Sequence, residues 1–111
     1  MEITTESFKR CDMVKVEGRI DSQTAPQLAE AMEAITDAGR YKIVVDMSEV
    51  GFISSAGLRV LINAQKTCNQ LNRGEVILAA VPERIYEIFD LAGLLPIFRF
   101  EDDVLHAIGN C

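Results

Sequence analysis

The chain has 111 residues, of which 49% are hydrophobic and 25% charged, with a formal net charge of −6. This size and balance are typical of one globular domain with a single hydrophobic core. The acidic charge repels phosphate backbones and anionic lipids, so neither nucleic acid nor a membrane surface is expected as a partner. No apolar run approaches the ~20 residues needed to cross a bilayer, and the first residues lack the features of a signal peptide. We therefore expect a cytoplasmic protein.

The first third of the chain predicts a β-hairpin followed by a helix. Apolar and polar residues alternate over residues 14–20, which indicates a half-buried strand, and a strand before it is expected over residues 3–9. Residues 21–24 are of the capping type. Apolar residues then recur at helical spacing over residues 25–35, and Gly39 supplies the stop.

The remaining two thirds alternate strands with helices. Strands are expected over residues 42–47, 75–81 and 97–100, and helices over residues 55–71, 82–93 and 104–108. Strand-helix-strand units of this kind predict parallel pairing with right-handed crossovers. The fold class is therefore α/β, with a mixed, mostly parallel sheet of about five strands and about four helices in the order β-β-α-β-α-β-α-β-α. We expect a single domain over residues 1–111.

The cysteines and the histidine offer no metal chemistry. Cys11, Cys68 and Cys111 are odd in number and far apart in sequence, which fits neither a close zinc pair nor a paired disulfide framework. We expect all three to be reduced thiols. His106 is the only histidine, so a His-rich metal site is out of reach. No cofactor and no metal are expected.

Two serines, Ser54 and Ser55, stand where the second helix is predicted to begin. The first turn of a helix has N–H groups without intrahelical partners and the positive end of the backbone dipole, so a phosphate there is hydrogen-bonded and charge-stabilised. Spacing alone favours the simpler interpretation that one serine is an N-cap. A phosphoryl group would bring about −1.5 to −2 charges into the same field. Ala56 and Gly57 leave the approach to this turn open.

Three segments carry a family resemblance. Residues 52–61 read Phe-Ile-Ser-Ser-Ala-Gly-Leu-Arg-Val-Leu, residues 18–21 read Gly-Arg-Ile-Asp, and residues 44–46 read Val-Val-Asp. Together they resemble the STAS family, in particular the bacterial anti-sigma factor antagonists, over nearly the whole chain. The resemblance implies a non-enzymatic switch protein that holds an anti-sigma factor while unphosphorylated and thereby frees the sigma factor. It also implies that the anti-sigma factor is itself a serine kinase and that a serine phosphatase reverses the modification.

The resemblance also implies site residues. The family motif puts the phosphoryl acceptor at Ser55. Sporulation-type members have an aspartate where this chain has Ser54, so Ser54 stays open as an alternative acceptor. Asp21 matches an acidic residue of the partner-binding surface, although an N-cap or Asx-turn explains it equally well. The partner-binding residues implied are Asp21, Ser22, Thr24, Ser54, Ser55 and Gly57.

Three other functions stay open at this point. STAS domains also serve as subunits of sensory, transport or lipid-trafficking complexes, a role that needs no phosphate. A receiver-like domain would use Asp46 as phospho-acceptor, but only Asp21 lies nearby to help hold Mg²⁺. A serine hydrolase is disfavoured, because residues 53–57 lack the Gly-x-Ser-x-Gly spacing and His106 is expected to be packed or at the solvent edge. A monomer and a weak dimer both fit the surface charge.

Overall fold

The computed structural model describes residues 1–111, and its elements alternate as the sequence predicts. In chain order they are β1 (Glu2–Ser7), β2 (Asp12–Ile20), α1 (Ala25–Asp37), β3 (Lys42–Ile53), α2 (Ser55–Asn69), the 3₁₀ turn η1 (Gln70–Asn72), β4 (Glu75–Ala79), α3 (Glu83–Leu91), the 3₁₀ turn η2 (Leu95–Ile97), β5 (Arg99–Glu101) and α4 (Val104–Gly109). None of the helices is long and apolar enough to span a bilayer.

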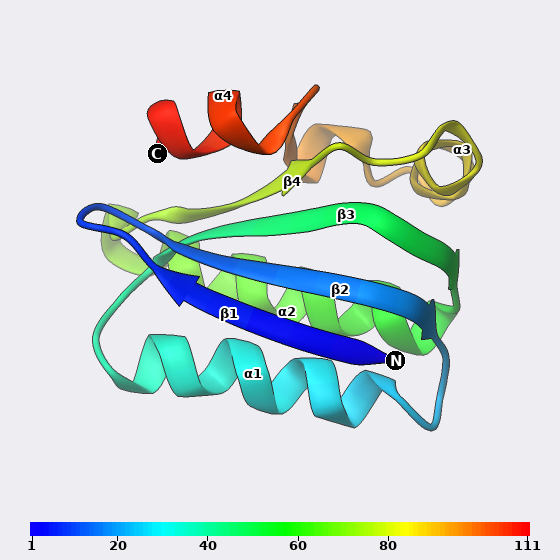
Figure 1. The fold of residues 1–111 in the computed structure, drawn as a ribbon, viewed down its shortest axis with the longest axis horizontal. Coiled ribbons are helices and arrows are strands. Elements are labelled where there is room, and N and C mark those ends of the chain that lie inside the picture. Colours follow the sequence, from blue (N-terminus) through cyan, green and yellow to red (C-terminus); the bar gives the residue numbers. More distant parts are fainter.

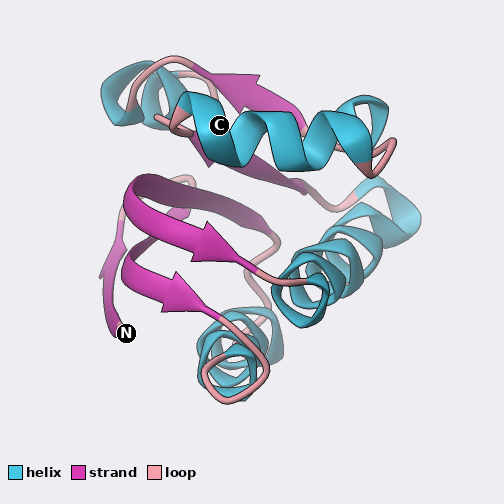
Figure 2. Ribbon diagram, turned by 90° about the vertical axis from the view of Figure 1, so that its right-hand side faces the viewer, coloured by secondary structure: helices cyan, strands magenta, loops and turns pink.

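The five strands form one mixed sheet in the spatial order β1-β2-β3-β4-β5. The hairpin partners β1 and β2 are antiparallel, and every other neighbouring pair is parallel. Helices α1 and α2 lie side by side on one face of the sheet, while α3 and α4 lie on the opposite side (Figure 1). Figure 2 shows the same layers from the side. The predicted fold class is confirmed.

The hydrophobic core lies mainly between the sheet and the helix pair α1/α2. Alternate residues of the central strands, such as Ile43 and Val45, point into this core because side chains along a strand alternate between its faces. Val44, between them, belongs to a second and smaller cluster under α4. The sheet is therefore apolar on both faces along β3 and β4, which explains why residues 42–47 are nearly all apolar, with Ile43, Val44 and Val45 in succession.

Strand β3 is longer than predicted. The expected strand over residues 42–47 continues to Ile53, and the register against β2 shifts twice, between Lys15 and Glu17 and between Gly18 and Arg19. The extension contains three exposed residues that are more typical of a turn than of a strand: Ser48, Glu49 and Gly51. Pairing with β2 keeps them extended, because β2 continues to Ile20 beside them. The predicted strand over 97–100 is likewise displaced, to Arg99–Glu101, after the turn η2.

The prediction that all cysteines are reduced is wrong for two of the three. Cys11 and Cys111 form a disulfide with their Cα atoms 6.2 Å apart, and only Cys68 is free. The spacing of the cysteines could not predict this disulfide, because the bond joins residues 100 positions apart in sequence. The fold brings them together because the turn before β2 and the end of the chain after α4 lie at the same end of the sheet (Figure 1).

Candidate functional site

The candidate site lies where β2 and β3 end and α2 begins. The backbone N–H of Ser54 donates to the carbonyl oxygen of Ile20 at 2.8 Å, which ties the start of α2 to the end of β2. Residues 21–24 leave β2 at this same point and lead into α1. The two segments that carry the predicted site residues are therefore brought together.

The two serines at the start of α2 have different environments. Ser54 is the N-cap: its backbone is extended and its Oγ accepts from the N–H of Gly57 at 3.4 Å. Ser55 is the first helical residue, it is exposed, and its hydroxyl makes no hydrogen bond within the chain. No acidic side chain occupies the first turn of α2. The hydroxyl of Ser55 is thus free at the positive end of a 15-residue helix.

Gly57 is buried beneath these serines. A Cβ atom added here would lie 2.6 Å from Cγ2 of Ile20 and 2.8 Å from Cγ1 of Ile53. Absence of a side chain therefore lets the first turn of α2 approach the ends of β2 and β3 closely. Any contribution of Gly57 to a partner-binding surface must act through the placement of Ser54 and Ser55.

The loop before α1 is held by its own side chains. Oδ1 of Asp21 accepts from the backbone N–H of Gln23 at 3.0 Å and of Thr24 at 3.1 Å, so the Asx-turn interpretation is confirmed. Oγ1 of Thr24 donates to the carbonyl oxygen of Arg19 at 2.8 Å and accepts from the N–H of Asp21 at 2.9 Å. The hydrogen bond from the Thr24 N–H, followed by that from Gln23, holds the pKa of Asp21 below its ordinary value. Asp21 therefore carries a fixed negative charge at the site, and its neighbour Ser22 is exposed.

Arg19 and Phe52 form a contact that the sequence did not predict. The guanidinium carbon of Arg19 lies 4.3 Å from the centre of the Phe52 ring, a cation–π contact between adjacent positions of β2 and β3. Arg19 is exposed and its charge contributes to the lowered pKa of Asp21. Only the strand register reveals this contact, because the two residues are 33 positions apart in sequence and neither stands in a motif with the other.

The structure does not bring together the residues that a receiver-like site or a serine hydrolase site would need. Asp46 lies within β3, is 7% exposed, and its Oδ1 accepts from the backbone N–H of Ser48 at 3.0 Å. No three His, Cys, Asp or Glu side chains are placed to hold a metal ion, as a receiver site requires. His106 is on α4, across the sheet from α2, with an exposed side chain whose Nδ1 is 2.8 Å from Oδ2 of Asp103. It is a solvent-edge residue with a carboxylate partner of its own.

Comparisons with known proteins agree on one family. The family model described as the STAS domain matches residues 2–107. The anti-sigma-B factor antagonist of Staphylococcus epidermidis is 32% identical over 104 residues, covering 92% of this chain and 95% of that protein. The crystal structure of an anti-sigma factor antagonist from Mycobacterium paratuberculosis has a TM-score of 0.84 at 25% identity, covering 98% of this chain and 92% of that one. SpoIIAA of Bacillus in its phosphorylated form shares the fold, with a TM-score of 0.77 at 16% identity and 98% of each chain covered. The chain belongs to the STAS-domain family.

Proposed function

We propose that the chain is an anti-sigma factor antagonist: unphosphorylated, it sequesters an anti-sigma factor and so releases a sigma factor. The relative from Staphylococcus epidermidis is named an anti-sigma-B factor antagonist and is matched over almost its full length. The observation that carries the proposal is the free, exposed hydroxyl of Ser55 beside the ordered Asp21 loop. The chain acts by binding, without enzymatic activity of its own.

Phosphorylation of Ser55 is the proposed switch. The anti-sigma factor serves as the serine kinase, and a serine phosphatase restores the binding form. Ser55 is preferred over Ser54 because the hydroxyl of Ser54 is occupied as the N-cap acceptor, whereas that of Ser55 is unbonded and reachable. SpoIIAA, whose fold this chain shares, also has a phosphorylated form. The proposed partner surface consists of Asp21, Ser22, Thr24, Ser54 and Ser55, placed from below by Gly57.

The proposed effect of the phosphate is electrostatic. A dianion at Ser55 must lose its hydration in the interface, and nothing repays that loss unless the partner supplies compensating charge. A penalty of about 3 kcal/mol weakens binding more than a hundredfold. The chain as a whole has a net charge of −6, so a further negative group adds to the repulsion of any acidic partner surface.

This function places the chain in the cytoplasm as a monomer or weak dimer, with neither nucleic acid nor membrane as a partner. The test is a titration with a cognate serine-kinase anti-sigma factor, using the variants Ser55→Asp, Ser55→Ala and Ser54→Ala. We expect Ser55→Asp to bind at least a hundredfold more weakly, and Ser55→Ala to bind normally but accept no phosphate from the kinase and ATP. Ser54→Ala should still gain one phosphate by intact-mass measurement.

Equal binding by Ser55→Asp and Ser55→Ala would contradict the switch. A chain that gains no phosphate under any condition, yet still co-purifies with a larger complex, would instead support the role of a scaffold subunit in a sensory, transport or lipid-trafficking assembly. Phosphate on Ser54→Ala and none on Ser55→Ala would confirm the acceptor. The opposite result would move the acceptor to Ser54.

A further inference from the structure

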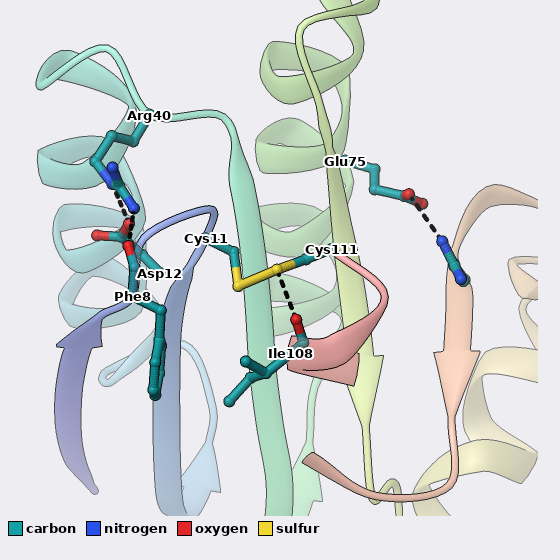
Figure 3. Close-up of a disulfide and its surroundings, with 8 residues drawn as sticks. Phe8, Cys11, Asp12, Arg40, Glu75, Ile108 and Cys111 are labelled. Atoms are coloured by element: carbon teal, nitrogen blue, oxygen red, sulfur yellow. Dashed lines mark hydrogen bonds and ion pairs between the residues drawn. A yellow bond between two sulfur atoms is a disulfide. The ribbon is translucent and has the colours of Figure 1, made fainter. Parts of the chain in front are cut away.

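The disulfide is remote from the serine site. Cys11 immediately precedes β2, and Cys111 follows α4 at the end of the chain (Figure 3). Ser55 lies beyond the opposite end of β2, whose nine residues at roughly 3.3 Å each put about 30 Å between the two places. Nothing in the proposed function uses the disulfide.

Helix α4 has few other attachments. It contains six residues, and only Ala107 among them is fully buried, while Leu105 is 84% exposed. It packs on a small cluster in which Val44, Ile77 and Ala79 supply the sheet side and Cys11 the edge. A helix this short does not persist without tertiary contacts. Its position therefore depends on this cluster and on the covalent bond to Cys11.

The two sulfur atoms differ in access. Cys11 is 1% exposed, whereas Cys111 is partly exposed, so an external thiolate approaches the bond from the side of the Cys111 Sγ. That Sγ lies 3.0 Å from the carbonyl oxygen of Ile108, which gives the reduced thiol an acceptor for its hydrogen (Figure 3). Cys68 cannot compete in exchange, because burial raises the pKa of its thiol to about 11. The exchange chemistry is confined to one pair.

We propose that Cys11 and Cys111 form a reversible redox lock, in which the disulfide clamps α4 to the sheet and reduction by a protein or small-molecule dithiol releases it. The thiolate of the dithiol attacks Sγ of Cys111, the Cys11–Cys111 bond breaks, and Cys11 leaves as a thiolate that takes a proton. The second thiol of the reductant then closes its own disulfide and releases Cys111, so two electrons and two protons pass to the pair.

The reverse step needs an oxidant of the peroxide class. Hydrogen peroxide transfers one oxygen to a thiolate, which becomes a sulfenic acid, and the other oxygen is released as water. The second thiol then attacks the sulfenic acid sulfur, the disulfide forms, and a second water is released. A reversible bond is also the kind expected in the cytoplasm, a location that rests on the proposed function, because lasting disulfides are rare there while redox-sensing ones occur. In the reduced state α4 loosens, and the apolar side chains of Val44 and Ile77 become accessible.

The lock can be tested on the purified chain by cysteine labelling under denaturing conditions after treatment with hydrogen peroxide or dithiothreitol. We expect one labelled cysteine after peroxide and three after the dithiol. On reduction, hydrogen exchange of the backbone amides in residues 104–109 should accelerate at least tenfold. The midpoint of thermal unfolding should fall by roughly 10–20 °C.

Two variants make the test specific. Cys111→Ser should show fast exchange in α4 under both conditions, whereas Cys68→Ser should keep the full redox response. Three labels after peroxide treatment would show that no bond forms and would overturn the proposal. So would a bond that survives millimolar dithiothreitol in the folded protein, or exchange in Cys111→Ser as slow as in the oxidised wild type. None of these outcomes depends on Ser55 or on an anti-sigma factor, so failure of the lock and failure of the proposed switch are distinguishable.

Discussion

Gly57→Ala tests whether close contact between α2 and the strand ends positions the candidate site. The new Cβ would meet Ile20 at 2.6 Å and Ile53 at 2.8 Å, both branched side chains that are at most 3% exposed. Neither can move into solvent, so the first turn of α2 must shift outward. Overpacking of this kind costs about 1–3 kcal/mol, and the better helix propensity of alanine returns up to about 1 kcal/mol. We expect a net destabilisation of about 1 kcal/mol.

Urea unfolding and thermal scans of the oxidised protein measure this loss, and the thermal midpoint should fall by roughly 4–6 °C. Gly51→Ala is the matched control, because a Cβ added at Gly51 meets nothing within 4 Å and its effect should stay within about 0.5 kcal/mol. The displaced turn should also weaken partner binding in Gly57→Ala without any added charge. If Gly57→Ala proves as stable as Gly51→Ala and binds the partner normally, close packing does not set the geometry of the site.

Hydrogen bonds made by three side chains can each be removed by one substitution. Ser54→Ala removes the N-cap acceptor for the Gly57 N–H, and because that bond is long at 3.4 Å, urea unfolding should show a loss of only about 0.5–1 kcal/mol. Gln65→Leu removes the acceptor for the buried N–H of Val76 and the donor to the carbonyl of Ile97, so the same assay should show a loss of about 1–3 kcal/mol, mainly from the unpaired Val76 N–H. The hydrogen bond from the His106 backbone N–H is the main cause that lowers the pKa of Asp103 in the folded chain. The ionised Asp103 therefore stabilises the fold above the ordinary pKa of 3.8, and this stabilisation is lost as the pH falls through the lower pKa of the folded state. Asp103→Asn should flatten that acidic decline in an unfolding series, and an unchanged decline would contradict the assignment.

The predicted elements were those whose pattern is local. Alternation identified β2, and helical spacing identified α1 and α2 nearly to their ends. The second half of β3 was not predicted, because its exposed residues Ser48, Glu49 and Gly51 show no apolar pattern. They are extended because β2 runs alongside, and on the other side β4 has already ended at Ala79. Pairing between distant segments decides the structure there, and a single sequence does not display that pairing.

The same distinction divides the site. Serine at a helix start is a local signal, so Ser54 and Ser55 could be placed in advance, but which hydroxyl is occupied depends on the turn that α2 makes at Gly57. The Asx-turn of Asp21 is local and was foreseen as one of two roles. Two other contacts join segments that are distant in sequence: the cation–π contact of Arg19 with Phe52, and the disulfide between Cys11 and Cys111. The spacing of these residues in the sequence indicates neither contact.

The hydrogen bonds of the site are made by the residues around Ser55 and not by its hydroxyl. The N–H of Ser54 is bonded to Ile20, the Oγ of Ser54 to Gly57, and the carboxylate of Asp21 to its own loop. A phosphoryl group on Ser55 therefore breaks no internal bond, and it enters the positive end of α2, where anions are stabilised. The phosphorylated chain should thus unfold at the same temperature as the unmodified chain or a higher one. Loss of partner binding would then arise at the interface, by charge and desolvation, and not from damage to the fold; a phosphorylated chain that unfolds several degrees lower would refute this.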